Sequence, residues 1–277
     1  MTALLYVISI FGSVGQTTLG KQYTKKGGRA TDFNICKAAS GALFFLIAGL
    51  IGGLEFHTPT VMIGAVYGVF LCIAMYTGLE ALALGPMGLT GMIGSFYLVI
   101  PLLFGLIAWD ETLSGFGIAG LCLLAASLIM INAKAGGGTS LKWAVYALST
   151  MAANGFCSVA QKYHQRSFPG QYRTEFMLSA LTVITVLLVM KKLLKKESFK
   201  PCLSGFAAGI FNGASQYIVL LLAAEVKASV LFPVLSVSNI MAAWAVGLIF
   251  FKEKTSLKQA AGLLCGLVSL ILLNISA

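Results

Sequence analysis

Charged residues are scarce in this chain, and their scarcity excludes a soluble globular protein. Only 10% of its 277 residues are charged, whereas 58% are hydrophobic and the mean hydropathy is +0.91; soluble domains carry about a quarter charged residues. Apolar runs of about 18 residues or more recur along the chain, as a bilayer core about 30 Å thick requires of each crossing helix. Barrel strands would be much shorter than these runs. We therefore expect an all-α polytopic membrane protein of the cell (inner or plasma) membrane.

Motifs for catalysis and nucleotide binding are also missing. The sequence has no HExxH, GxSxG or GxxxxGK[ST] motif, which argues against an enzyme and against ATP-driven transport by this chain alone. Its six cysteines form no CxxC pair and no Cys/His cluster, so no metal, disulfide or cofactor is expected. The net charge of +10 lies between the apolar runs, where it indicates membrane orientation rather than nucleic-acid binding.

An internal duplication organises the chain. Residues 105–132 match residues 247–274 at 12 of 28 positions without a gap, and the matches include Gly120 with Gly262. Weaker matches at nearly the same spacing pair residues 9–23 with 149–163, 64–76 with 205–217, and Asp32 and Phe33 with Glu175 and Phe176. A repeat of this length predicts two halves of similar structure.

Ten transmembrane helices are expected, five in each half. They are predicted at residues 3–20, 34–54, 60–83, 87–108, 113–133, 141–162, 173–191, 203–224, 228–250 and 257–276. The first repeat then covers residues 1–135, a Gly-rich linker covers 136–140 and the second repeat covers 141–277. Because five is odd, the second repeat must cross the membrane upside down relative to the first. Inverted repeats of this kind are typical of secondary transporters, whose binding site lies near the midplane.

The repeated segments resemble a known family. The sequences LIAWDETLS and LIFFKEKTS recur at the same place in each half, and ALALGPMGL from Ala81 corresponds to AAEVKASVL from Ala223. In these features the chain is similar to the EamA-type drug/metabolite transporter superfamily over nearly its whole length. The resemblance implies a ten-helix carrier that works by alternating access. It also implies cytoplasmic termini, as such carriers usually have.

The distribution of basic residues predicts the opposite orientation. Fifteen of the 19 Lys and Arg residues lie on one side of the expected helices, within residues 21–37, 134–142, 191–200 and 252–258. The other four are Lys162, Arg166, Arg173 and Lys227. Because basic residues are retained in the cytoplasm, the charge count predicts that both termini are extracytoplasmic.

Polar groups inside apolar helices are costly, so they mark the candidate substrate site. Glu80 comes first because a carboxylate at mid-membrane costs about 3 kcal/mol, and we expect it to supply the only buried charge. It follows Tyr76 by one turn on a helix of small residues, and it either binds a proton or cation or reaches the interface. The other predicted contacts are Ser13, Gln16, Thr17, Tyr97, Asn154, Ser158, Asn212, Gln216, Tyr217, Asn239 and Trp244. These side chains could instead join neighbouring helices.

Three further residues are ambiguous. Lys37 lies just inside the second expected helix, where it could neutralise a substrate carboxylate, pair with Glu80 or reach the headgroups. His57 and His164 lie at helix ends without a metal partner at suitable spacing, so we expect both to be solvated.

These features predict a secondary transporter of a small neutral, zwitterionic or monocationic metabolite. Fixed charge is too scarce for multiply charged substrates such as phosphates, which call for Arg or Lys in the cavity. Coupling to protons is one option, and the transporter would work as a monomer or homodimer. The alternative is an intramembrane enzyme acting on a lipid-linked substrate, which would need a cluster of ionisable groups at mid-membrane.

Overall fold

The computed structural model describes five stretches of the chain, residues 2–108, 114–132, 140–225, 228–252 and 257–275. Within them the chain is all-α, with eleven α-helices, one 3-10 helix and no strand. In chain order these are α1 (Thr2–Lys25), α2 (Ala30–Gly52), α3 (Thr58–Leu84), α4 (Met87–Ser95), η1 (Phe96–Leu98), α5 (Val99–Ala108), α6 (Gly115–Asn132), α7 (Leu141–Ser167), α8 (Arg173–Leu194), α9 (Leu203–Glu225), α10 (Ala228–Phe251) and α11 (Leu257–Ile275). Each expected helix has a helical counterpart here.

The first helix is longer than its apolar run predicts. It continues to Lys25, whereas the expected helix ended at residue 20. Lys21 is buried and its Nζ donates to the carbonyl of Gly85 at 3.2 Å. The amines of Lys21 and Lys25 also lie over the ring of Phe251. The helix extends past the apolar run because a lysine stem packs on apolar surface while its amine finds polar or aromatic partners.

The helix expected at residues 87–108 is interrupted at its centre. Phe96–Leu98 forms a 3-10 turn between α4 and α5. Pro101 follows this turn, and a proline lacks the N–H for the helical bond and clashes with the carbonyl four residues earlier, here that of Tyr97. The 3-10 turn therefore includes Tyr97, the residue whose carbonyl Pro101 leaves without its helical hydrogen bond.

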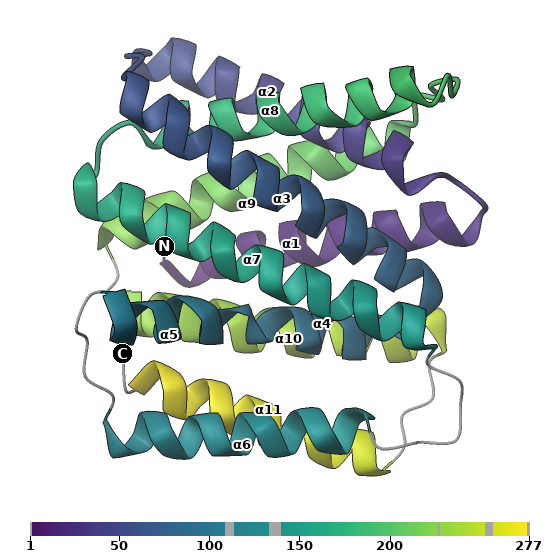
Figure 1. The fold of residues 1–277 in the computed structure, drawn as a ribbon, viewed down its shortest axis with the longest axis vertical. Coiled ribbons are helices and arrows are strands. Elements are labelled where there is room, and N and C mark those ends of the chain that lie inside the picture. The colour runs from purple at the N-terminus through teal and green to yellow at the C-terminus, as the bar shows by residue number, and fades with distance from the viewer. Residues whose placement is uncertain (1, 109–113, 133–139, 226–227, 253–256, 276–277) are drawn as a thin grey trace.

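Helices from the two halves of the chain pair throughout the molecule. α2 packs on α8, α4 on α10 and α6 on α11, while α1 packs on α9 and α3 on α7. Figure 1 shows α2 and α8 at one edge and α6 and α11 at the opposite edge. The remaining helices lie between these two pairs, so the polar candidates on α1, α3, α7, α9 and α10 occupy the middle of the fold.

Apolar side chains fill the contacts between these helices. Phe45, Leu181 and Ile184 are buried where α2 meets α8. Trp143 of α7 is 1% exposed, and its Nε1 donates to Thr90 Oγ1 of α4 at 2.9 Å. The packing thus joins the two halves of the chain rather than enclosing each half separately.

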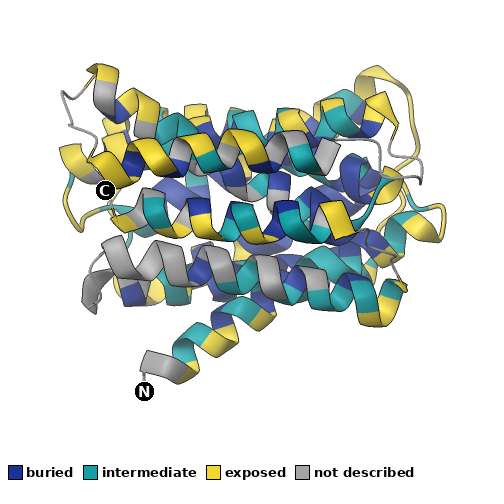
Figure 2. Ribbon diagram, turned by 90° about the horizontal axis from the view of Figure 1, so that it is seen from below, coloured by how far each residue is buried: buried dark blue, intermediate teal, exposed yellow. Residues whose placement is uncertain are grey.

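The outer surface is compatible with a membrane protein. Ala30–Gly52, Thr58–Leu84 and Arg173–Leu194 are each long and apolar enough to cross a bilayer, by length and composition. Figure 2 shows exposed residues along the outer sides of the helices. Large apolar side chains such as Leu50 and Ile51 are exposed.

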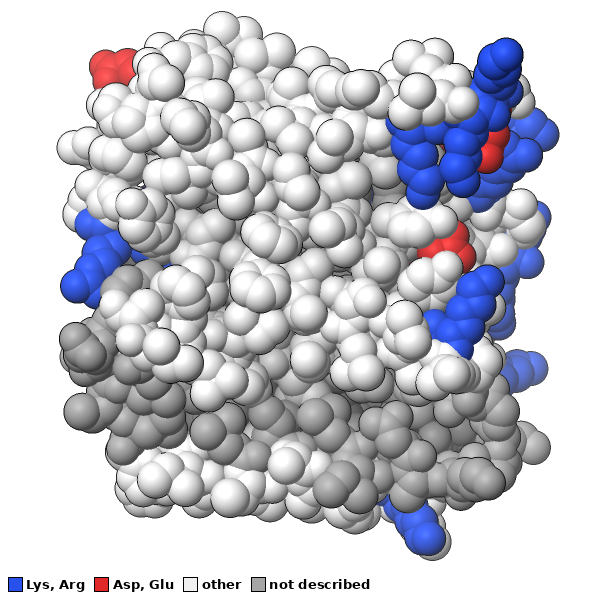
Figure 3. Space-filling model, in the orientation of Figure 1, with Lys and Arg blue, Asp and Glu red and all other residues white. Residues whose placement is uncertain are grey.

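Basic side chains are concentrated at one end of the helices. In Figure 3 most visible Lys and Arg residues lie along one edge of the molecule, with few at the other. The crowded edge is where α8 ends with Lys191 and Lys192. α1 begins and α11 ends towards the opposite edge (Figure 1). On this face the basic residues therefore lie mostly at one end of the helices, as their positions in the sequence predict.

Candidate functional site

The close approach of α1 and α9 organises the polar residues predicted on these helices. The Ser215 hydroxyl donates to the carbonyl of Ser9 at 2.8 Å, and a Cβ on Gly12 would lie 3.0 Å from the carbonyl oxygen of Phe211. Gln16 lies one turn after Gly12 on the same side of α1. Its Oε1 is buried and has no hydrogen-bond partner among the described residues. Because buried polar atoms are nearly always paired, this oxygen points to a missing donor.

Asn239 of α10 repeats this feature. Its Oδ1 is buried, again without a hydrogen-bond partner in the described part of the chain, and α10 packs on α1. Two predicted contact residues on adjoining helices thus keep an unused acceptor.

Asn212 and Gln216 share one side of α9. Gly209 faces α2 and Ser215 faces α1. At 100° per residue, Asn212 and Gln216 project between these two sides, and both are half-buried. The structure therefore directs these two amides towards the interior that α9 shares with α1 and α2.

Two predicted hydroxyl residues, Thr17 and Ser158, bond to backbone carbonyls of their own helices instead. Thr17 Oγ1 donates to the carbonyl of Ser13 at 3.0 Å. On α7, Ser158 Oγ donates to the carbonyl of Asn154 at 3.2 Å. Hydroxyls bonded to their own helix have used their proton and retain only acceptor capacity. Thr17 and Ser158 are therefore weaker candidates than Gln16.

The predicted aromatic residues do not lie in one place. Tyr217 is 39% exposed and packs on α2. Tyr97 is half-buried in the 3-10 turn, and Tyr76 lies on α3 with Nζ of Lys191 3.6 Å from its ring centre. The side chain of Trp244 lies outside the described residues. No common aromatic wall is formed by the three that are described.

Glu80 is not the only buried charge, and this expectation is wrong. Its side chain is half-buried, and Tyr76 one turn away lies within electrostatic reach of Glu80, Lys142 and Lys195. Glu80 therefore lies near the basic end of α3, where a carboxylate reaches polar surroundings at lower cost. Among the described residues, the buried charged side chains are Lys21, Asp32, Glu175 and Lys192.

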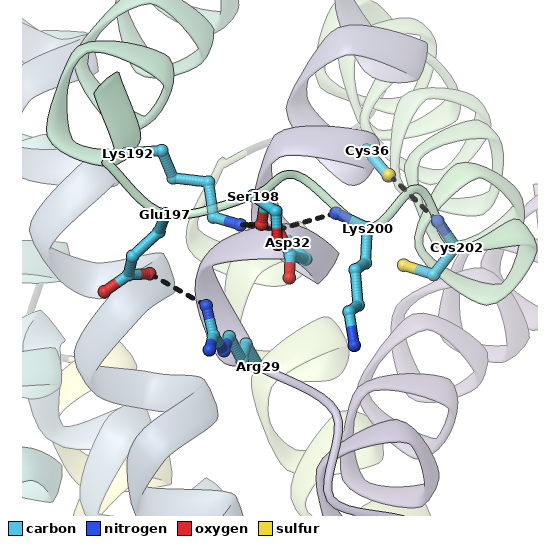
Figure 4. A network of polar contacts seen from close by, with 8 residues as sticks. All are labelled: Arg29, Asp32, Cys36, Lys192, Glu197, Ser198, Lys200 and Cys202. Carbon is cyan, nitrogen blue, oxygen red and sulfur yellow. Dashed lines mark hydrogen bonds and ion pairs between the residues drawn. The ribbon is translucent and has the colours of Figure 1, made fainter. Parts of the chain in front are cut away.

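Asp32 and Lys192 form a buried ion pair that joins α2 to α8 (Figure 4). Nζ of Lys192 also donates to the carbonyl of Ser198 at 2.6 Å, and the Lys200 N–H donates to Oδ1 of Asp32 at 3.4 Å. The side chains of Asp32 and Lys192 are 1% and 4% exposed. The pair therefore fixes the first turn of α2 to the last turn of α8 and to the segment that follows it.

Glu175 occupies the corresponding position at the opposite end. It lies in the first turn of α8, as Asp32 lies in the first turn of α2. Its Oε1 accepts from the backbone N–H of Glu55 at 3.1 Å. Each carboxylate thus binds the backbone of the connection that leaves the other helix, Glu55 after α2 and Lys200 after α8.

The histidines are not both solvated as expected. His164 is 2% exposed, because α7 continues past it, and its Nε2 lies 3.3 Å from the hydroxyl of Thr60. Its ring stacks on Phe176 with centroids 4.6 Å apart, and the His57 ring stacks on Tyr172 at 5.1 Å. The two histidines therefore belong to an aromatic cluster at the end of the molecule opposite the Asp32–Lys192 pair.

Comparison with known proteins shows the fold alone. No model of a known protein family matches the chain, and no curated protein matches it. A solved structure described only as "Crystal structure of protein" is similar over 98% of this chain and 95% of that chain, with a TM-score of 0.67 and 17% sequence identity. At this identity the likeness supports a shared fold and carries no function.

Proposed function

We propose that this protein is a secondary transporter of a small metabolite, with ten membrane spans in two inverted repeats, as in the drug/metabolite transporters that its sequence resembles. A reciprocal pair of hydrogen bonds between α6 and α11 carries the proposal. Ser127 Oγ donates to the carbonyl of Gly262 at 2.8 Å, and Ser269 Oγ donates to the carbonyl of Gly120 at 2.7 Å. These residues correspond pairwise in the internal duplication. A contact that recurs with donor and acceptor exchanged supports a twofold relation between the halves.

The glycines of α3 and α9 give a second reciprocal contact. A Cβ on Gly64 would lie 2.8 Å from the carbonyl oxygen of Phe176 on α8, and a Cβ on Gly205 would lie 2.8 Å from that of Phe33 on α2. Phe33 and Phe176 also correspond in the duplication. Each half therefore lays its third helix against the second helix of the other half, which supports interlocked repeats.

The two ends of this arrangement suggest how access alternates. The buried ion pair of Asp32 holds α2 to α8 at the basic end, while Glu175 and the aromatic cluster hold the same two helices near α3 and α7 at the other end. In an inverted repeat, opening one end is matched by closing the equivalent contact at the other. The two sets of contacts loosen in turn during transport.

The substrate binds between α1, α3, α4, α7, α9 and α10 in this proposal. The unpaired oxygens of Gln16 and Asn239 and the inward amides of Asn212 and Gln216 favour a ligand with hydrogen-bond donors. One such ligand is a neutral, zwitterionic or monocationic metabolite. Glu80 remains a proposed proton carrier. Its half-buried position near the basic end, where a carboxylate reaches polar surroundings, makes it a weaker candidate for that role than a fully buried carboxylate would be.

Exchange in proteoliposomes tests the proposal. We expect counterflow of at least one pool among amino acids, nucleosides, amines and sugars, with liposomes holding heat-unfolded protein as the control. In the same assay Glu80→Gln should retain exchange but lose its dependence on a pH gradient if Glu80 carries the coupling proton. No exchange of any pool by folded, monodisperse protein would contradict the transporter.

Reporter fusions test the orientation. Because positive residues are retained in the cytoplasm, an alkaline phosphatase fused at the C-terminus should be active and a fluorescent protein there should be dark. The linker at residues 136–140 follows five spans, so the same reporters inserted there should give the reverse pattern and serve as the control. A bright C-terminal fluorescent protein would place the termini in the cytoplasm and reject the charge-based orientation.

A further inference from the structure

Lys37 lies on the protein-facing side of α2. One turn before it, Asn34 donates to the carbonyl of Met75 on α3 at 3.0 Å. One turn after it, a Cβ on Gly41 would lie 3.3 Å from the side chain of Leu181 on α8. The three residues lie within about 60° of one another around the helix. Lys37 therefore shares the side of α2 that these two neighbours turn towards other helices.

Lys37 forms no ion pair with an anionic side chain in the described part of the chain. Its side chain is half-buried. None of the ion pairs among the described residues involves it. An ammonium that is partly enclosed by protein and has no counter-charge is costly, whereas the buried Lys192 has Asp32. The difference indicates that the counter-charge of Lys37 is not part of the described chain.

Gln16 and Lys37 flank the same turn of α9. α1 runs antiparallel to α9 with Gly12 opposite Phe211, so Gln16, one turn further along α1, lies opposite the turn before Phe211. On the side of α9 that faces α2, about 120° around the helix from the side that faces α1, a Cβ on Gly209 would lie 3.0 Å from the carbonyl carbon of Lys37. A cation and an amide oxygen, neither of which has a partner among the described residues, thus lie beside the same part of α9.

We propose that Lys37 pairs with the single carboxylate of a zwitterionic metabolite, whose amino group donates to Oε1 of Gln16. This inference rests on the proposed transport function and narrows its substrate class. A lone cation is rejected because Lys37 would repel it, and a dianion is rejected because the site offers one positive charge. The inward amide of Asn212, one turn past Gly209, is placed to contact the substrate beside them.

Matched pairs of compounds provide the test. Counterflow and thermal unfolding in detergent are measured with leucine and isoamylamine, and with phenylalanine and phenethylamine, which differ by the carboxylate. We expect at least one amino acid to exchange and to raise the unfolding temperature, with its amine at least about tenfold weaker, the value of one charge-assisted hydrogen bond. Lys37→Gln should lose this preference, whereas Lys258→Gln, an exposed lysine at the start of α11, should keep it.

Lys37→Met keeps the apolar stem and gives a second variant in case Lys37→Gln fails to fold. Lys37→Arg keeps the charge and should retain part of the binding. Equal exchange of amines and amino acids, or a Lys37→Met protein with unchanged amino-acid exchange, would overturn the carboxylate site and leave the transporter intact. The same follows if only sugars or nucleosides exchange. If no pool exchanges and no compound shifts the unfolding temperature, the transport function fails and the site fails with it.

Discussion

Asp32→Asn is expected to lower the free energy of unfolding by about 3–5 kcal/mol, the range for breaking a buried ion pair by removing one partner. The substitution leaves the ammonium of Lys192 buried without a counter-charge, with only neutral acceptors such as the carbonyl of Ser198. Asparagine can still accept from the N–H of Lys200, so the loss is mainly the charge. Unfolding of the purified protein in mixed micelles, followed by circular dichroism, measures it.

Glu197→Gln is the matched control. Glu197 forms an ion pair with Arg29 at 3.2 Å beside the buried pair (Figure 4), but the two side chains are 35% and 57% exposed. Exposed pairs contribute about 0–1 kcal/mol, so this variant should unfold almost as the wild type does. The double variant with Asp32→Asn and Lys192→Met should regain much of the lost stability, because no charge stays buried. Equal losses for Asp32→Asn and Glu197→Gln would contradict the burial of the pair.

The helices could be predicted because residues that disfavour a helix separate the apolar runs. The apolar runs of α3 and α4 are separated by Gly85 and Pro86, and the structure ends α3 and begins α4 on either side of them. Proline inside a run was less informative. Pro101 follows an interruption between α4 and α5, whereas Pro233 lies within the uninterrupted α10. Whether a helix breaks at proline depends on packing that a single run does not encode.

The duplication predicted which residues of the two halves are equivalent, but not that equivalent helices would touch. It matched Ser127 with Ser269 and Gly120 with Gly262, and the structure adds that each serine bonds the other half's glycine. Contacts between residues this far apart in the chain depend on how the two halves pack together. Local periodicity carries no information about that.

The buried charges were missed because they lie at the ends of apolar runs, where a loop is expected to begin. Asp32 and Lys192 stand at the edges of apolar runs, where charged residues normally reach headgroups or cap helices. One signal could have found them: Asp32 and Phe33 match Glu175 and Phe176 between the halves, and both carboxylates are buried. His164 was misjudged for a similar reason, because α7 extends five residues beyond its expected end.

Gly209→Ala is expected to destabilise the protein by about 2 kcal/mol through overpacking. The added methyl group would meet the backbone of Lys37 and the side chain of Ser40 on α2, and helix backbone cannot move away as a flexible side chain can. α2 would have to shift relative to α9, which also displaces Lys37. We therefore expect weaker exchange together with a lower unfolding temperature.

Gly15→Ala separates this effect from helix propensity. No atom lies within 4 Å of a Cβ at Gly15, and alanine favours a helix interior over glycine by about 1 kcal/mol, so this variant should be neutral or more stable. Gly68→Ala should behave like Gly209→Ala, because its Cβ would lie 2.7 Å from the carbonyl oxygen of Ala180 on α8. Equal losses at positions 68 and 209 are what a twofold relation between the halves requires. A Gly209→Ala protein as stable as Gly15→Ala would contradict the close contact between α2 and α9. This contact sets the position of Lys37 beside α9.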